Sequence, residues 1–127
     1  MREESKILVA DRNRHVREFL KRELMSEGYR VRLAKNGKEV MRWIDYHEPF
    51  DLLIIDPNLP DEAELKVLEK LMDYVPSIPV VIHSYCLDYS TRPAISGSTV
   101  FVEKSGSSVE VLKKVVIEVL RKSKTWI

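Results

Sequence analysis

The sequence predicts an α/β fold with a doubly wound sheet of five parallel strands and helices on both faces. Two observations predict it. Apolar runs of strand length alternate with segments of helical period along the whole chain. Polar side chains follow four of the five apolar runs, which is where parallel sheets of this kind bind ligands.

The first two strands differ in the exposure that their sequences predict. Residues 6–11 (KILVAD) form a short apolar run, typical of a buried strand, whereas residues 29–34 (YRVRLA) alternate apolar with basic, typical of a half-exposed one. Between them we expect a helix that Asn13 caps and Gly28 ends. Asn36 and Gly37 predict a turn, and a second helical face follows it at Val40, Met41 and Ile44.

The remaining elements repeat this alternation. Residues 51–56 (DLLIID) predict a central strand that is covered on both sides. Residues 78–84 and 99–103 predict two more strands. Capping boxes at 61–64 and 107–110 predict a helix start after the third and the fifth strand, while residues 87–96 predict only a short helix. The half-exposed second strand suits an edge, which favours the order 2-1-3-4-5 of flavodoxin-like folds.

Composition narrows the class of protein. The chain has 127 residues, a normal length for one domain over residues 1–127, and its net charge of +1 argues against broad binding of nucleic acid. The apolar stretch near the start ends at Asp11, too short for a signal peptide or a membrane span. Cys86 is the single cysteine, so we expect no disulfide and a cytoplasmic location.

Four polar residues follow the strands at their C-terminal ends. Asp11 and Asp56 end adjacent strands, and Ser84 and Lys104 end the next two. A carboxylate can accept a phosphoryl group as a nucleophile, and lysine and hydroxyl donors can hold its oxygens. The pattern therefore indicates a phosphoryl-transfer site. The chain has no P-loop and no G-x-G-x-x-G segment, so a nucleotide-binding enzyme is not expected.

The segments KILVAD, DLLIIDPNLP, PVVIHS and FVEK occur in this order, and together they resemble the receiver domain of two-component response regulators. The resemblance covers almost the whole chain. It implies a signalling module, not an enzyme, in which Asp56 accepts a phosphoryl group and Ser84 and Lys104 contact it. It also implies that Phe101 is the aromatic residue that changes rotamer on activation.

The resemblance further implies Mg²⁺, with Asp11, Asp56 and the backbone carbonyl of Asn58 as ligands. Receivers usually carry a second acid after the first, and here that position is Arg12. Arginine cannot bind a cation, so we expect Mg²⁺ binding to be weakened or lost. Three alternatives stay open for Arg12: its guanidinium pairs with Asp56 or Asp11, it points into solvent, or it supplies part of the metal's charge.

Two further positions make the pocket atypical. Tyr85 stands where receivers usually have a small residue, and it could cover the pocket. Ser105 stands where they usually have a proline; because a cis bond without proline costs about 3 kcal/mol, we expect a trans bond there. His83 lies inside a predicted strand, and we expect a buried histidine with its hydrogen bonds satisfied.

Two functions follow from these features. The first is a receiver domain in a phosphorelay that takes its phosphoryl group from a histidine kinase or phosphotransfer protein and then switches the face that binds a downstream protein. The second is a pseudo-receiver, an interaction module that needs no phosphorylation. The retained Asp56, Ser84, Lys104 and Phe101 favour the first, and Arg12, Tyr85 and Ser105 favour the second. Neither binds nucleic acid directly or enters a membrane.

Overall fold

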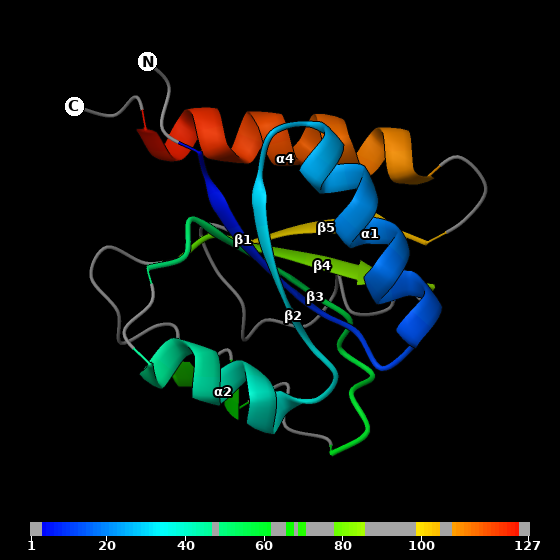
Figure 1. Cartoon of the computed structure of the whole chain (residues 1–127), viewed down its shortest axis with the longest axis vertical. Helices are drawn as coiled ribbons and strands as arrows, with labels where there is room; N and C mark the ends of the chain where they lie inside the picture. Colours follow the sequence, from blue (N-terminus) through cyan, green and yellow to red (C-terminus); the bar gives the residue numbers. More distant parts are fainter. Residues whose placement is uncertain are drawn as a thin grey trace.

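A five-stranded parallel sheet forms the centre of the protein (Figure 1). The structure, a computed structural model, describes residues 4–46, 49–61, 66–67, 69–70, 78–85, 99–104 and 108–124. The strands in these ranges are β1 (Lys6–Ala10), β2 (Arg30–Ala34), β3 (Leu52–Ile55), β4 (Val80–Ser84) and β5 (Thr99–Glu103). Their order is β2-β1-β3-β4-β5 and every pair is parallel, as predicted.

Helices cover both faces of the sheet. The helices α1 (Arg14–Ser26) and α4 (Ser108–Lys124) lie on one face, and α2 (Gly37–Asp45) lies on the other (Figure 1). The α2 face buries Val40 and Ile44 against one set of strand side chains. The α1 and α4 face buries a second apolar cluster, which includes Leu20 of α1 and Leu112 of α4.

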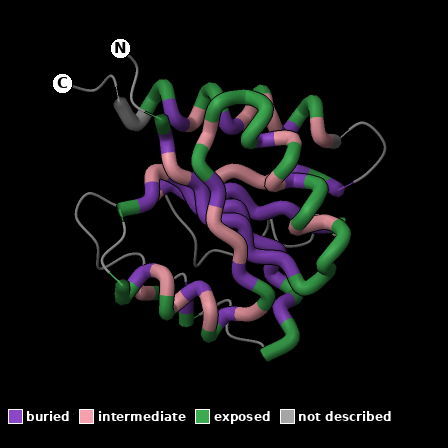
Figure 2. The backbone as a smooth tube through the Cα atoms, viewed as in Figure 1, coloured by how far each residue is buried: buried purple, intermediate pink, exposed green. Residues whose placement is uncertain are grey.

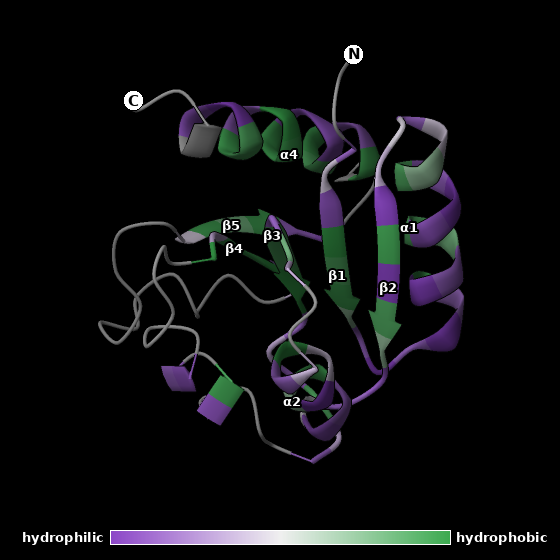
Figure 3. Cartoon of the chain, turned by 60° about the vertical axis from the view of Figure 1, so that its left-hand side comes forward, coloured by the Kyte–Doolittle hydropathy of each residue, from purple (hydrophilic) through white to green (hydrophobic). Residues whose placement is uncertain are grey.

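The central strand is buried on both sides. All four residues of β3 are buried, and so are all five of β4 (Figure 2). By contrast, β2 keeps Arg30 exposed, and the outer side of α1 is mostly hydrophilic (Figure 3). The continuous apolar run therefore marks the middle of the sheet and the alternating run marks its edge, as the sequence predicted.

The ends of α1 agree with the sequence. The side chain of Asn13 accepts hydrogen bonds from the backbone N–H groups of His15 and Val16, and this caps the start of the helix. At the other end Gly28 has a φ of 96°, a conformation that costs glycine little because it has no Cβ.

The start of α2 corrects the prediction of a turn. Asn36 is the N-cap of α2 and Gly37 is its first residue, so the pair begins the helix instead of forming a separate turn. The Asn36 side chain accepts a hydrogen bond from the N–H of Glu39 at 2.9 Å. The N–H groups of Gly37 and Lys38 donate to the two carboxylate oxygens of Asp61, each at 3.0 Å. The loop after β3 is thereby tied to the start of α2.

The edge strand β2 is partly covered by α2. The indole N–H of Trp43 donates to the carbonyl oxygen of Leu33 at 3.0 Å, and the Arg32 guanidinium lies 5.6 Å from the centre of the same indole. Trp43 also packs edge-on against Phe50, with 6.3 Å between ring centres. One outward-facing backbone acceptor of the edge is thus occupied from within the chain.

Several predictions lie outside the described residues. These are the segment 87–96, residues 62–65 of the first capping box, Ser107 of the second, and the residues Ser105 and Cys86. Residues 66–67 and 69–70 are helical, as expected after the third strand. In the described ranges, no helix combines the length and the apolar character that crossing a membrane requires.

Candidate functional site

The polar residues at the strand ends come together in one buried site. Asp11, Asp56, Ser84 and Lys104 are all buried, although each carries a charge or a hydroxyl. Backbone hydrogen bonds continue the sheet through them: Asp56 N–H donates to Ala10 O at 2.8 Å and Lys104 N–H donates to Ser84 O at 2.8 Å. The four residues that sequence position suggested therefore lie side by side at the C-terminal edge of the sheet.

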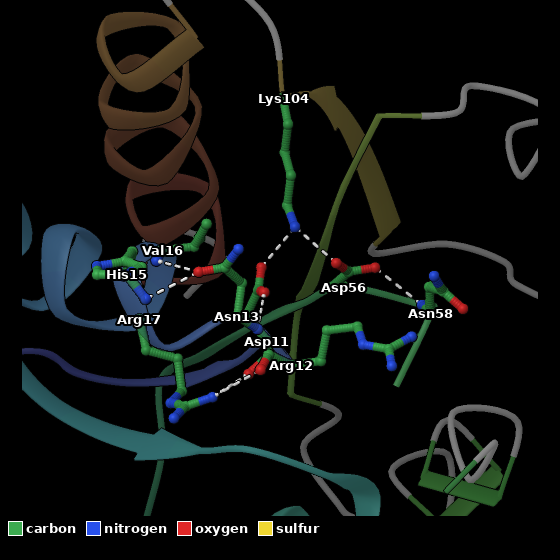
Figure 4. Close-up of polar contacts among 9 residues, drawn as sticks. All are labelled: Asp11, Arg12, Asn13, His15, Val16, Arg17, Asp56, Asn58 and Lys104. Atoms are coloured by element: carbon green, nitrogen blue, oxygen red, sulfur yellow. Dashed lines mark hydrogen bonds and ion pairs between the residues drawn. The ribbon is translucent and has the colours of Figure 1, made fainter. Parts of the chain in front are cut away.

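A single ammonium group links the two carboxylates. Lys104 Nζ donates to Asp11 Oδ2 at 2.5 Å and to Asp56 Oδ2 at 2.6 Å (Figure 4). The side chains of Lys104 and Asp11 are 5% and 2% exposed, so solvent screens these ion pairs little. Burial alone would lower the pKa of Lys104, but the hydrogen bonds to Asp11 and Asp56 outweigh it, and the net shift of its pKa is upward. Lys104 is therefore a fixed positive charge at neutral pH.

The other oxygen of each carboxylate accepts a backbone hydrogen bond. Asn13 N–H donates to Asp11 Oδ1 at 2.8 Å, and Asn58 N–H donates to Asp56 Oδ1 at 2.8 Å (Figure 4). In both cases the donor lies two residues further along the chain, the geometry of an Asx turn. All four carboxylate oxygens thus have a donor before any ligand arrives.

Arg12 does not form the ion pair that one alternative expected. Its side chain is exposed, and the ionic partner of both Asp11 and Asp56 among the described residues is Lys104. The prediction that the guanidinium pairs with either carboxylate is wrong, because Lys104 reaches both from the end of β5. The guanidinium lies on the same side of the pocket as Asn58 (Figure 4).

Arg17 supports the loop that carries Asp11 and Arg12, a role that the sequence did not reveal. One nitrogen of its guanidinium, Nη1, donates to the carbonyl oxygens of Asp11 at 2.8 Å and of Arg12 at 3.1 Å (Figure 4). Arg17 lies in the first turn of α1, and its sequence context does not distinguish it from the other basic residues of this helix that face solvent. The signal available in the sequence was its spacing: Arg17 lies six residues after Asp11 and five after Arg12, so its side chain can reach back to their carbonyls.

Tyr85 lies against Lys104 at the mouth of the site. The Lys104 ammonium is 5.3 Å from the centre of the Tyr85 ring, within the range of a cation–π interaction. Tyr85 itself is 74% exposed. One face of a largely exposed aromatic ring thus lies close to the buried ammonium.

Phe101 and Ser84 lie where the sequence placed them. Phe101, in β5, is half-buried and packs against the apolar cluster on the α2 face. Ser84 is buried at the end of β4. The geometry is compatible with the roles predicted for both residues.

His83 differs from its prediction. It is buried at the end of β4, and neither ring nitrogen has a hydrogen-bond partner among the described residues. Burial, helped by the positive charge of Lys104 and opposed by Asp56, lowers the pKa of His83 to about 4. The expectation of a satisfied buried histidine is wrong: the neighbouring strand β5 presents Val102 opposite His83, and an apolar side chain offers no partner.

The groups that a divalent cation would meet here are two carboxylates with an ammonium between them. Asp11 and Asp56 supply two carboxylates, but a lysine ammonium bridges them and an arginine follows the first. No group of three or more His, Cys, Asp and Glu side chains suited to a metal occurs within the described ranges. Mg²⁺ in proteins is held mainly by carboxylates and water, and nearby positive charge opposes it.

Comparison with known proteins identifies the class. Residues 7–116 match the family model of the response regulator receiver domain. The chain belongs to this family, and it is a receiver domain of two-component signalling: a signalling module, not an enzyme. Receiver domains interact with histidine kinases.

Curated relatives share the sequence of this domain but are much longer. Over 100 residues, 77% of this chain, the sequence is 34% identical to the DNA-binding transcriptional regulator NtrC of a Bradyrhizobium species. Over 77 residues, 61% of the chain, it is 35% identical to the response regulator MprA of Mycolicibacterium vanbaalenii. The matched region spans 21% of the first relative and 33% of the second.

Solved structures agree with the fold. The response regulator TrrA of Thermotoga maritima, in complex with Mg²⁺ and BeF, has a TM-score of 0.79 and 28% identity, covering 91% of this chain and 98% of that one. A two-component response regulator from Clostridium difficile has a TM-score of 0.82 and 26% identity, covering 96% of this chain and all of that one (100%).

Proposed function

We propose that Asp56 is the phospho-acceptor of this receiver domain and that its phosphoryl group comes from a phosphohistidine on a histidine kinase or phosphotransfer protein. One observation carries the proposal: the carboxylate of Asp56 lies at the C-terminal end of a buried central strand, within hydrogen-bonding distance of the Lys104 ammonium. A carboxylate is a suitable nucleophile toward phosphorus, and the ammonium stabilises the negative charge on the phosphoryl oxygens.

The neighbouring residues take the roles that their positions support. Ser84 is the last residue of β4, which lies beside β3, and Lys104 directly follows β5, one strand further away. Both residues therefore contact the phosphoryl group. Phe101, half-buried on the α2 face, changes rotamer and alters the surface that a downstream protein binds. This use of the domain involves no direct contact with nucleic acid. The single cysteine supports a cytoplasmic location, and residues 1–127 act as one domain.

For the metal, the proposal is that this domain binds Mg²⁺ more weakly than receivers that carry two acidic residues after the first strand. The structure of TrrA was solved in complex with Mg²⁺ and BeF. In this chain, the groups available to hold Mg²⁺ are the carboxylates of Asp11 and Asp56 and the backbone carbonyl of Asn58. Arg12 occupies the position of the missing carboxylate, and its charge persists at any working pH.

A second candidate, the pseudo-receiver, is favoured by the ion pairs themselves. Lys104 already neutralises Asp56 from one side, and Tyr85 lies beside that lysine at the pocket mouth. A site closed in this way would keep one conformation, and the domain would then act only by binding a partner.

Intact mass after incubation with acetyl phosphate separates the two functions. The wild-type protein and an Asp56→Asn variant are incubated with the phosphodonor, and masses are recorded over time. The receiver function predicts a gain of one phosphoryl group in the wild type and none in the variant. No gain in the wild type overturns the assignment of Asp56 and favours the pseudo-receiver. An equal gain in both proteins places the phosphoryl group elsewhere.

A further inference from the structure

The formal charges in the pocket and of the adjacent Arg12 sum to zero without a metal ion. Asp11 and Asp56 each contribute one negative charge, and Lys104 and Arg12 each contribute one positive charge, which gives a sum of zero. The Lys104 ammonium donates to both carboxylates, and an arginine does not titrate in proteins, so both groups count as positive charges.

A receiver site with a third carboxylate has a different net charge before any metal ion binds. Three carboxylates and one lysine sum to minus two, and binding of one divalent cation brings that sum to zero. In the present chain, exchange of the third carboxylate for Arg12 changes the sum by plus two, the charge of the missing ion. The pocket and the exposed Arg12 beside it therefore have together, from side chains alone, the total charge that such a site reaches only with a bound divalent cation.

The positions of the two cations agree with this reasoning. The Lys104 ammonium lies between Asp11 Oδ2 and Asp56 Oδ2, at 2.5 Å and 2.6 Å, so it already neutralises the repulsion between the two buried carboxylates. The Arg12 side chain is exposed and points toward the side of the pocket where Asn58 lies (Figure 4). A planar guanidinium with several N–H donors is well suited to the oxygens of a phosphoryl group.

We propose that Asp56 accepts its phosphoryl group without a divalent cation, and that Arg12 and Lys104 supply the positive charge that the transfer requires. This inference rests on the proposed function of Asp56. With acetyl phosphate, a carboxylate oxygen of Asp56 attacks phosphorus and forms a new O–P bond. The bond between phosphorus and the acetyl oxygen breaks, and acetate leaves with that electron pair. No proton is transferred, and the products are an acyl phosphate on Asp56 and one acetate ion.

The test compares phosphorylation rates with and without metal. Wild-type protein stripped with EDTA is incubated with acetyl phosphate, either in EDTA or in a series of Mg²⁺ concentrations, and its mass is followed over time. The variants are Arg12→Asp, which restores the acidic pair, and Arg12→Gln, which removes only the charge. Arg14→Gln is the matched control, because Arg14 is an exposed arginine two residues further along the chain. Mg²⁺ binding to each protein is measured separately by titration calorimetry.

The expected pattern has three parts. The wild type and the Arg14→Gln control are phosphorylated in EDTA at a rate that Mg²⁺ changes less than about twofold, since the site charge is already neutral. Arg12→Gln reacts at least about tenfold more slowly in EDTA, because one of the stabilising charges is gone. Arg12→Asp is inactive in EDTA, is rescued by Mg²⁺, and binds Mg²⁺ at least about tenfold more tightly than the wild type.

The failures of the two proposals are distinguishable. Phosphorylation of the wild type only when Mg²⁺ is present overturns the metal-free inference and leaves Asp56 as the acceptor. An Arg12→Gln rate in EDTA equal to that of the wild type overturns the role of Arg12. No phosphorylation in any buffer overturns the function of Asp56 and the inference with it, whatever the calorimetry shows.

Discussion

His83 makes the stability of the domain depend on pH in a direction that its burial determines. The pKa of this histidine falls from 6.5 to about 4 in the folded protein, while the unfolded chain keeps the ordinary value. Between these two values the unfolded chain binds a proton and the folded protein does not. Protonation therefore favours unfolding as the pH falls below about 6.5.

The magnitude follows from the difference in pKa. A difference of about 2.5 units corresponds to about 3 kcal/mol of unfolding free energy once the pH is below both values. Between pH 7 and pH 4.5, where only part of the titration is complete, the loss attributable to His83 is about 2 kcal/mol. The two ring nitrogens without partners add a second cost, because a buried unsatisfied polar group destabilises by about 1–3 kcal/mol at any pH.

The substitution His83→Leu tests this effect, because it keeps a similar side-chain volume and removes the titrating ring. Urea unfolding is followed by circular dichroism at pH 7, 5.5 and 4.5 for the wild type, the variant and a His15→Gln control, since His15 is exposed on α1. We expect the stability advantage of His83→Leu over the wild type to grow by about 2 kcal/mol from pH 7 to pH 4.5, and no such growth for His15→Gln. An advantage that is constant with pH would refute the reasoning, because it would show that His83 does not carry the depressed pKa.

Four more variants test the interactions around the site. Lys104→Met leaves two buried carboxylates without their cation, so we expect urea unfolding at pH 7 to show a loss of about 3–5 kcal/mol; a loss below 1 kcal/mol would contradict the buried ion pairs. Tyr85→Ala removes the ring beside the ammonium, so stability should fall by about 0.5–1 kcal/mol while acetyl phosphate modifies Asp56 faster by mass spectrometry; a slower rate would rule out a covering role. Asp61→Asn and Asn36→Ala each weaken the cap of α2 and should each cost about 1 kcal/mol in the same unfolding assay. Only the Asp61 variant should also change the phosphorylation rate, because only Asp61 ties the loop after Asp56 to α2, and equal rates for the two variants would contradict that.

The sheet was predictable because each strand carries its own signal. The continuous apolar run 52–55 requires burial on both faces, which predicts a central strand. The alternating run 30–34 requires one exposed face, which predicts an edge strand. The positions of Asp11, Asp56, Ser84 and Lys104 followed from the topology alone, since parallel strands end at one edge. The comparisons confirm the family and the fold that these features indicated.

The interactions that the sequence did not reveal depend on side-chain reach between distant segments. Lys104 lies 93 residues from Asp11, and no local pattern distinguishes it from Arg12 as the partner of that carboxylate. Asp61 matched a capping box for the helix after it, yet its oxygens accept from Gly37 and Lys38, 24 and 23 residues earlier. The apolar run around His83 correctly predicted that this residue is buried. Whether its ring nitrogens find a hydrogen-bond partner depends on the side chains of the neighbouring strands, which the local sequence does not reveal.

The partly covered edge of β2 has a consequence for association at high concentration. A parallel edge strand exposes backbone groups that can pair with the edge of another molecule and start aggregation. Here the Trp43 indole occupies the Leu33 carbonyl, and the Arg30 and Arg32 side chains bring positive charge to the same edge. The β2 edge of a second copy would have to displace the indole and bring like charges together. The side chains of β2 and α2 thus oppose pairing between the β2 edges of two molecules.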